Sequence, residues 1–65
     1  MKIIVNGDAR EVSEPMLDAV LNELGFGRSV VATALNGEFV SASARPSTSL
    51  EEGDRLEVLA PMQGG

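Results

Sequence analysis

The stretch SEPMLDAVLNELG, residues 13–25, carries the clearest structural signal in this chain. Its apolar side chains recur at helical spacing and so form one stripe: Met16, Leu17, Val20, Leu21 and Leu24. Ser13 is placed to cap the first turn with its hydroxyl group, and Gly25 is typical of a helix end with a left-handed backbone. The pattern predicts one amphipathic helix that covers an apolar surface formed by the rest of the chain.

Strand signals flank this helix on both sides. The strand segments are short apolar or β-branched runs bounded by turn residues: 1–6, 10–12, 30–35, 38–40 and 55–60. Two turns between them carry Asn-Gly, at residues 6–7 and 36–37, and both residue types accept positive φ at low cost. This order predicts an α+β fold in which one helix covers a mixed sheet of four to five strands. If the first and last strands pair in parallel at its centre, the sheet is a ubiquitin-like β-grasp sheet.

Alternation along the strands separates two faces of the predicted sheet. Four side chains are expected to face the core: Ile3, Val5, Leu56 and Val58. Ile4 and Leu59 then face outward on neighbouring strands. Residues 41–49, rich in Ser, Ala and Thr, are interpreted as an irregular loop or a fragment of helix, with Leu50 as its anchor to the core.

The chain has 65 residues, which gives room for one domain, residues 1–60, followed by a tail, residues 61–65. Pro61 ends the last strand because proline has no donor for the ladder. Gly64 and Gly65 carry no side chain, so they make the thinnest and most flexible chain end available. Fully extended, the tail reaches about 17 Å, long enough to thread a narrow channel in a partner protein.

The chain contains no cysteine and no histidine. Disulfides, thiolate metal sites and Ser-His-Asp or Cys-His catalysis are therefore excluded, and no metal site is expected. A chain this short also lacks room for a pocket of about 300 Å³ or more beside an intact core. The sequence predicts a binding module or a substrate of other enzymes, and not an enzyme.

Ten acidic residues against five basic ones give a net charge of −5. This charge repels phosphate backbones and anionic membranes, so neither nucleic acid nor a membrane is an expected partner. It would attract a basic protein partner, although it could equally well serve solubility alone. The sequence shows no signal peptide and no apolar run near ~20 residues, and we expect a cytoplasmic protein.

The last residues complete a resemblance to a known family. The ending Pro61-Met62-Gln63-Gly64-Gly65, after EGDRLEV at residues 52–58, resembles that of the bacterial thiamine sulfur carriers of the ThiS family. Residues 34–40 (ALNGEFV) resemble the family's central hairpin and residues 3–7 (IIVNG) resemble its start, so the resemblance covers essentially the whole chain. Residues 41–49 depart from the family, whose members often carry basic or aromatic residues there.

The resemblance implies a sulfur carrier for thiazole formation in thiamine biosynthesis, with the carboxyl group of Gly65 as its working group. An E1-like adenylyltransferase would consume ATP to form an acyl adenylate at Gly65. A sulfurtransferase or other persulfide donor would replace AMP with sulfur, and thiazole synthase would receive the resulting thiocarboxylate. Gly64 and Gln63 would give clearance in the partner's channel. No cofactor bound to the carrier is implied, and the free protein is expected to be a monomer.

Three other functions stay open on the sequence. The small subunit of molybdopterin synthase shares the fold and the thiocarboxylate but is usually longer. A ubiquitin-like modifier would form isopeptide bonds with lysines, and a plain interaction domain would use no terminal chemistry. For docking, one hypothesis is an outward apolar patch of Ile4 and Leu59 extended by Met62. The alternative interpretation has equal weight, because single exposed apolar residues are normal.

Overall fold

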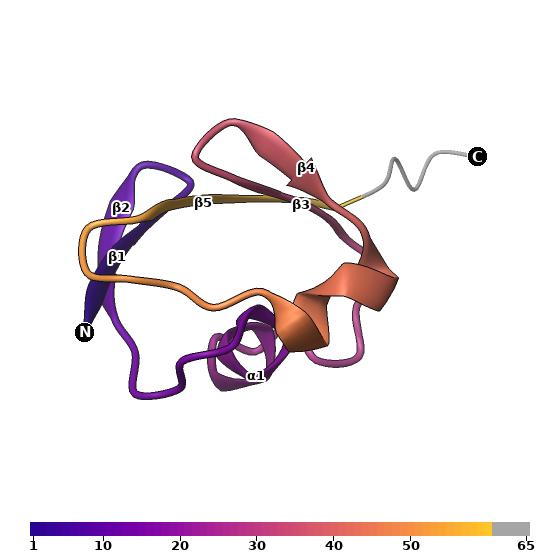
Figure 1. The fold of residues 1–65 in the computed structure, drawn as a ribbon, viewed down its shortest axis with the longest axis horizontal. Coiled ribbons are helices and arrows are strands. Elements are labelled where there is room, and N and C mark those ends of the chain that lie inside the picture. Colours follow the sequence, from indigo (N-terminus) through magenta and orange to yellow (C-terminus); the bar gives the residue numbers. More distant parts are fainter. Residues whose placement is uncertain (61–65) are drawn as a thin grey trace.

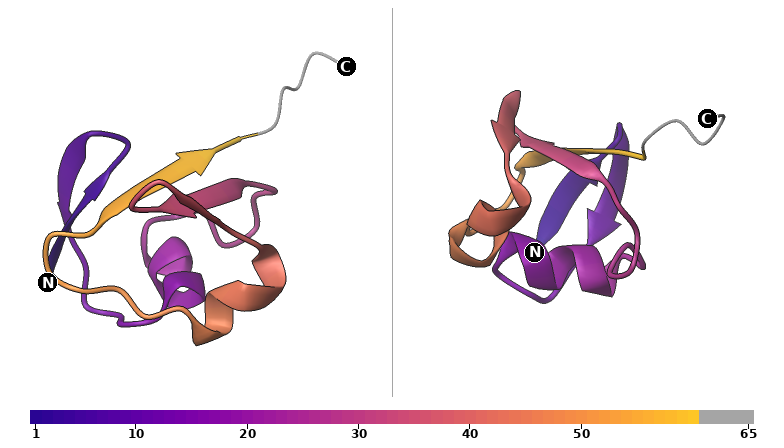
Figure 2. Two further views of the ribbon diagram at one scale, coloured as in Figure 1. Left: turned by 45° about the horizontal axis from the view of Figure 1, so that its top comes forward. Right: turned by 90° about the vertical axis from the view of Figure 1, so that its right-hand side faces the viewer.

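The computed structural model describes residues 1–60, and the predicted tail, residues 61–65, lies outside the described part. Five strands form one sheet in the order β2-β1-β5-β3-β4. The elements along the chain are β1 (Lys2–Val5), β2 (Asp8–Glu11), α1 (Leu17–Glu23), β3 (Ala32–Leu35), β4 (Glu38–Val40), the 3-10 helix η1 (Ala42–Ser47) and β5 (Arg55–Leu59). Both helices lie on one side of the sheet, and the tips of the two hairpins rise on the other (Figure 1, Figure 2).

The first and last strands lie side by side at the centre of the sheet, as predicted. β1 pairs with β5 in parallel, with Ile4 opposite Arg55 and Val5 opposite Leu56. The other pairs, β1 with β2, β3 with β4 and β3 with β5, are antiparallel. This mixed sheet with one covering α-helix is the β-grasp arrangement expected from the sequence.

Both Asn-Gly pairs form the predicted hairpin turns. Asn6 and Asn36 each have a φ of 51°, and Gly7 and Gly37 each have a φ of 87°. Two successive residues with positive φ are the signature of the turn type that matches the twist of paired strands. The two turns therefore have almost the same backbone, although they flank β5 on opposite sides.

The start of α1 differs from the prediction. Ser13 is not its N-cap: the helix begins at Leu17, after an extended Met16 that has no side-chain cap. The N–H of Leu17 instead donates to the carbonyl of Thr48 at 2.8 Å, and Met16 forms an isolated bridge with Ser49. A distant segment thus supplies an acceptor for the first turn, and it leaves Ser13 outside the helix.

The end of α1 follows the prediction. Gly25 has a φ of 97°, a conformation that glycine adopts without steric cost. The N–H of Gly25 donates to the carbonyl of Asn22 and the N–H of Phe26 donates to that of Leu21. This bond pair is the Schellman motif, which satisfies carbonyls that the helix itself leaves free.

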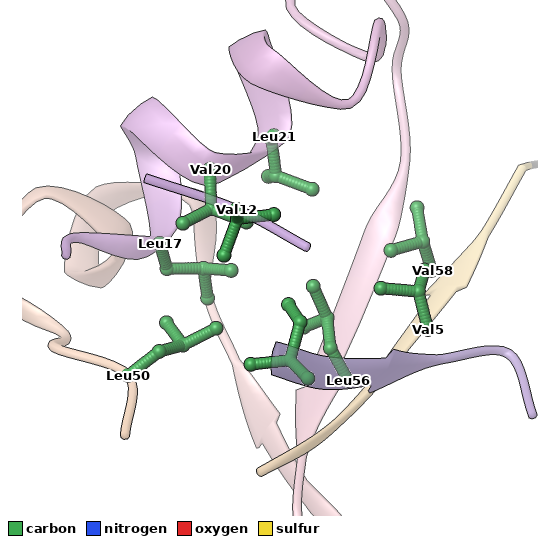
Figure 3. Close-up of a cluster of buried hydrophobic side chains, with 9 residues drawn as sticks. Val5, Val12, Leu17, Val20, Leu21, Leu50, Leu56 and Val58 are labelled. Carbon is green, nitrogen blue, oxygen red and sulfur yellow. The ribbon is translucent and has the colours of Figure 1, made fainter. Parts of the chain in front are cut away.

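The core lies between α1 and the inner face of the sheet. It consists of nine buried side chains: Ile3, Val5, Val12, Leu17, Val20, Leu21, Leu50, Leu56 and Val58. Figure 3 shows the helix side chains pointing toward those of β1 and β5, with Leu50 closing one side. The four predicted inward residues of β1 and β5 are all buried, and Leu50 is the predicted anchor.

Residues 41–49 form mainly the 3-10 helix η1, one of the two predicted alternatives. Arg45 fastens η1 to β3: its Nη2 donates to the carbonyl of Val31 at 2.7 Å and its Nε to Thr33 Oγ1 at 3.1 Å. The hydroxyl of Thr33 is buried and donates in turn to the carbonyl of Val40. Within residues 1–60, no helix has the length and apolar character needed to cross a bilayer.

Candidate functional site

The group predicted to react, the carboxyl group of Gly65, lies outside the part of the chain that the structure describes. Gly65, Gly64, Gln63 and Met62 all lie outside residues 1–60. The strand that precedes them, β5, is the central strand of the sheet, with Leu56 and Val58 buried beneath it. The base of the predicted tail is therefore anchored in the most constrained strand of the fold.

Hydrogen bonds hold the last part of β5 from both sides. On one side β3 continues as far as the pair of Ala32 and Leu59. On the other side β1 ends at Val5, and the side chain of Asn6 takes its place. The Nδ2 of Asn6 donates to the carbonyl of Val58 at 3.1 Å, and the N–H of Val58 donates to Oδ1 of Asn6 at 2.9 Å. The amide group thus replaces one peptide unit of a neighbouring strand.

The first part of β5 is held in a similar way by Asn36. The N–H of Arg55 donates to Oδ1 of Asn36 at 2.9 Å, and Nδ2 of Asn36 donates to Oδ1 of Asp54 at 3.1 Å. The two turn asparagines therefore bind the two ends of the same strand.

The outer face of the sheet contains both described residues of the predicted docking patch. Ile4 is half-buried and Leu59 is 66% exposed. Ile4 lies opposite Arg55, whereas Leu59 lies opposite Ala32, four positions farther along β5. Arg55 lies beside Ile4, and the outward-facing Glu57 lies between Arg55 and Leu59 along β5. A docking role for Ile4, Leu59 and Met62 stays a prediction.

Two exposed apolar side chains were missed in the sequence. Phe39 is 73% exposed and Val30 is 80% exposed. Phe39 pairs with Ala34 on the same face as Ala32 and Leu59. We call the residues Leu59, Ala32, Ala34 and Phe39 the outer strip. Side chains alternate between the two faces of a strand, so the inward Val40 would have placed its neighbour Phe39 on the outer face. Val30 was predicted to lie in a strand, but β3 begins two residues later, at Ala32.

A hollow of about 380 Å³ lies on the outer face, lined by residues of β1, β5 and both hairpin turns: Ile4, Asn6, Gly7, Gly37, Arg55, Leu56 and Glu57. Its volume contradicts the expectation that a chain this short has no room for such a pocket. The hairpins build it at no cost to the core, because their tips rise away from α1 (Figure 1).

A further polar cluster lies on the helix side of the molecule, around the carboxylate of Glu23. It accepts the N–H groups of Ser13 and Glu14 and the hydroxyl of Ser13, all at 3.0–3.1 Å. These bonds, first that of the Ser13 N–H and then that of the Glu14 N–H, lower the pKa of Glu23. The cluster joins the end of α1 to the segment before it, which is a structural role.

Known proteins resemble the chain over its whole length. The model of the ThiS family matches residues 3–65. The sulfur carrier protein ThiS of Thermus thermophilus is 39% identical over 61 residues, which are 94% of this chain and 95% of that protein. The crystal structure of the thiamine biosynthesis protein ThiS from Geobacter metallireducens has 30% identity and a TM-score of 0.84, with 100% of both chains covered.

A longer relative contains a segment of the same kind. The thiazole synthase of Paramagnetospirillum magneticum is 38% identical over 66 residues, which cover 100% of this chain. The chain spans only about a fifth of that protein, since the match covers 20% of its length.

Proposed function

The chain belongs to the ThiS family, and from this we propose that it is a sulfur carrier of thiamine biosynthesis that works through the carboxyl group of Gly65. An E1-like adenylyltransferase joins this carboxylate to AMP, with ATP as co-substrate and pyrophosphate as leaving group. A persulfide sulfur then attacks the acyl carbon and AMP leaves. A thiol cleaves the remaining S–S bond, which yields the thiocarboxylate and a disulfide.

The activation step follows from the chemistry of the group. A free α-carboxyl group has a pKa of about 3.3–3.7, so at pH 7 it is an ionised and poor electrophile. The adenylate removes that charge from the acyl carbon and supplies a good leaving group. In this proposal the carrier is a protein co-substrate of other enzymes, has no bound cofactor and contributes no catalytic residue.

The observation that carries the proposal is the extent of the family match, which runs from residue 3 through Gly65. It includes the Gly-Gly pair together with the β-grasp domain. Without a Cβ, Gly64 and Gly65 can enter a channel that any side chain would obstruct. Gln63 would then be the first residue with a side chain to meet the channel entrance.

The proposed recipient of the sulfur is thiazole synthase. Support comes from the long relative of that name, which contains a segment 38% identical to this chain. A carrier-like segment within a thiazole synthase chain is consistent with two partners that act together. The exposed outer strip, next to the base of the tail, is the surface we propose for docking, together with Ile4 and Met62.

Mass spectrometry tests the proposal directly. The carrier is incubated with the adenylyltransferase, ATP and a persulfide donor, and the fragment that contains Gly65 is measured. We expect the mass change of one oxygen replaced by sulfur. A carrier with one extra residue after Gly65 is the matched control and should stay unchanged, as should a sample without ATP.

The outcomes separate the candidate functions. An unchanged mass in the complete mixture would overturn the sulfur-carrier proposal. Sulfur transfer to the large subunit of molybdopterin synthase, and not to thiazole synthase, would assign the chain to that pathway. Conjugates to lysine side chains, visible as bands of higher mass on a gel, would identify a protein modifier.

A further inference from the structure

We propose that Asn6 is a positioning residue that sets the direction in which the chain leaves the sheet toward Gly65. The proposal rests on the proposed function, because it concerns how the terminal carboxyl group is presented to the activating enzyme. Its basis is the pair of hydrogen bonds that joins the amide of Asn6 to the backbone of Val58.

The geometry explains why β5 needs this contact. Parallel pairing with β1 covers only Arg55 and Leu56. The N–H of Asn6 still donates to the carbonyl of Leu56 at 3.0 Å, but the chain then turns away into the hairpin. Without the side-chain amide, both polar backbone groups of Val58 on this edge would lack a partner among residues 1–60. Asn6 therefore extends the support of β5 beyond the end of β1.

The contact between Asn6 and Val58 lies near the end of β5, so it can affect where Gly65 is placed. Val58 is the last residue of β5 held from the β1 side, and seven peptide units separate it from Gly65. While a partner's channel holds these residues straight, they span about 24 Å and turn with the strand, so a change of about 5° in the direction of β5 at Val58 moves the end by about 2 Å. A misplacement of about 1 Å can cost ~100-fold in rate. Loose support at Val58 should therefore slow the reaction at Gly65.

Asn36 is a built-in control for this argument. It has the same φ of 51°, is followed by glycine, and also accepts a β5 N–H with its Oδ1. Its partner is Arg55, at the start of the strand, and the paired strands β1 and β3 hold β5 between Arg55 and the tail. A loss of the amide at Asn36 should weaken the fold without changing the exit direction.

The test uses Asn6→Gly and Asn36→Gly, since glycine accepts the positive φ of each turn and removes the side chain that carries the amide. Hydrogen exchange should accelerate at the Val58 N–H in the first variant and at the Arg55 N–H in the second. Pyrophosphate release by the adenylyltransferase is then measured at varied carrier concentration. We expect Asn6→Gly to lower kcat about tenfold or more with KM within about threefold. Asn36→Gly should leave both within about threefold.

The results separate this inference from the function on which it rests. If the wild-type carrier releases no pyrophosphate, the proposed function fails. If the wild type reacts and Asn6→Gly matches Asn36→Gly in kcat, the positioning role is overturned. Should Asn6→Gly unfold at the assay temperature, Asn6→Asp replaces it: its carboxylate accepts the Val58 N–H but cannot donate to the carbonyl. A folded Asn6→Asp carrier with the wild-type kcat would equally overturn the proposal.

Discussion

The two faces of β5 differ in what surrounds them. On the inner face, Leu56 is 0% and Val58 is 5% exposed, and both pack under α1 (Figure 3). On the outer face, Arg55, Glu57 and Leu59 are exposed, and Leu59 belongs to the outer strip. One strand with a period of two residues thus serves two purposes. Its inner side chains stabilise the domain, while its outer ones are free to contact a partner.

The largest effect is expected from Leu56→Ala on the inner face. The truncation leaves a cavity beneath β5, and such changes cost about 2–5 kcal/mol of unfolding free energy. Glu57→Ala, on the other face of the same strand, should change it by less than about 0.5 kcal/mol. Urea unfolding followed by circular dichroism measures both. Equal losses for the two variants would show that the faces do not differ in this way.

A smaller effect, on binding, is expected from Leu59→Glu on the outer face. The side chain is already 66% exposed, so the fold should tolerate the change within about 0.5 kcal/mol. A charge in an apolar contact should weaken binding to the adenylyltransferase about tenfold, a loss of about 1.4 kcal/mol. Ser43→Glu, which adds the same charge on η1, is the matched control and should bind as the wild type does. Calorimetric titration measures both affinities.

An unchanged affinity of Leu59→Glu would remove the outer strip from the docking surface. The same substitution at Ile4, and at Met62 outside the described residues, tests the rest of the predicted patch. Ile4 lies on β1 opposite Arg55, which is four positions before Leu59 on β5, so separate effects at Ile4 and Leu59 would indicate a broad contact.

The sequence predicted the features that depend on local patterns. The Asn-Gly turns, the alternation in β5 and the left-handed Gly25 all follow from the preferences of neighbouring residues. Features that depend on distant contacts were not predictable. The start of α1 depends on Thr48, and Asn6 reaches a residue 52 positions away. Val30 was missed because its exposure depends on where β3 begins, whereas alternation within β4 was enough to place Phe39 on the outer face. The predicted working group, Gly65, rests on resemblance to the family, because the described residues end before it.

The smallest effect concerns the layer that covers the inner face. Because N–H donors hold the pKa of Glu23 below its ordinary value, folding favours the ionised form. The resulting stability is fully present above the ordinary carboxyl pKa and is lost as the pH falls through the lowered, folded-state pKa. Glu23→Gln should therefore lower stability slightly at pH 7 and lose less than the wild type does on acidification. Thermal unfolding between pH 7 and pH ~3 measures this difference.

Glu57→Gln is the matched control, because it removes a carboxylate from the outer face and leaves the Glu23 cluster intact. On acidification, Glu57→Gln should therefore lose the stability that ionised Glu23 contributes, as the wild type does and Glu23→Gln does not. If Glu23→Gln loses as much stability on acidification as the wild type does, the hydrogen bonds from Ser13 and Glu14 to Glu23 do not make the stability of the fold depend on pH. In that case the protonation of this carboxylate has no part in holding α1 against the inner face.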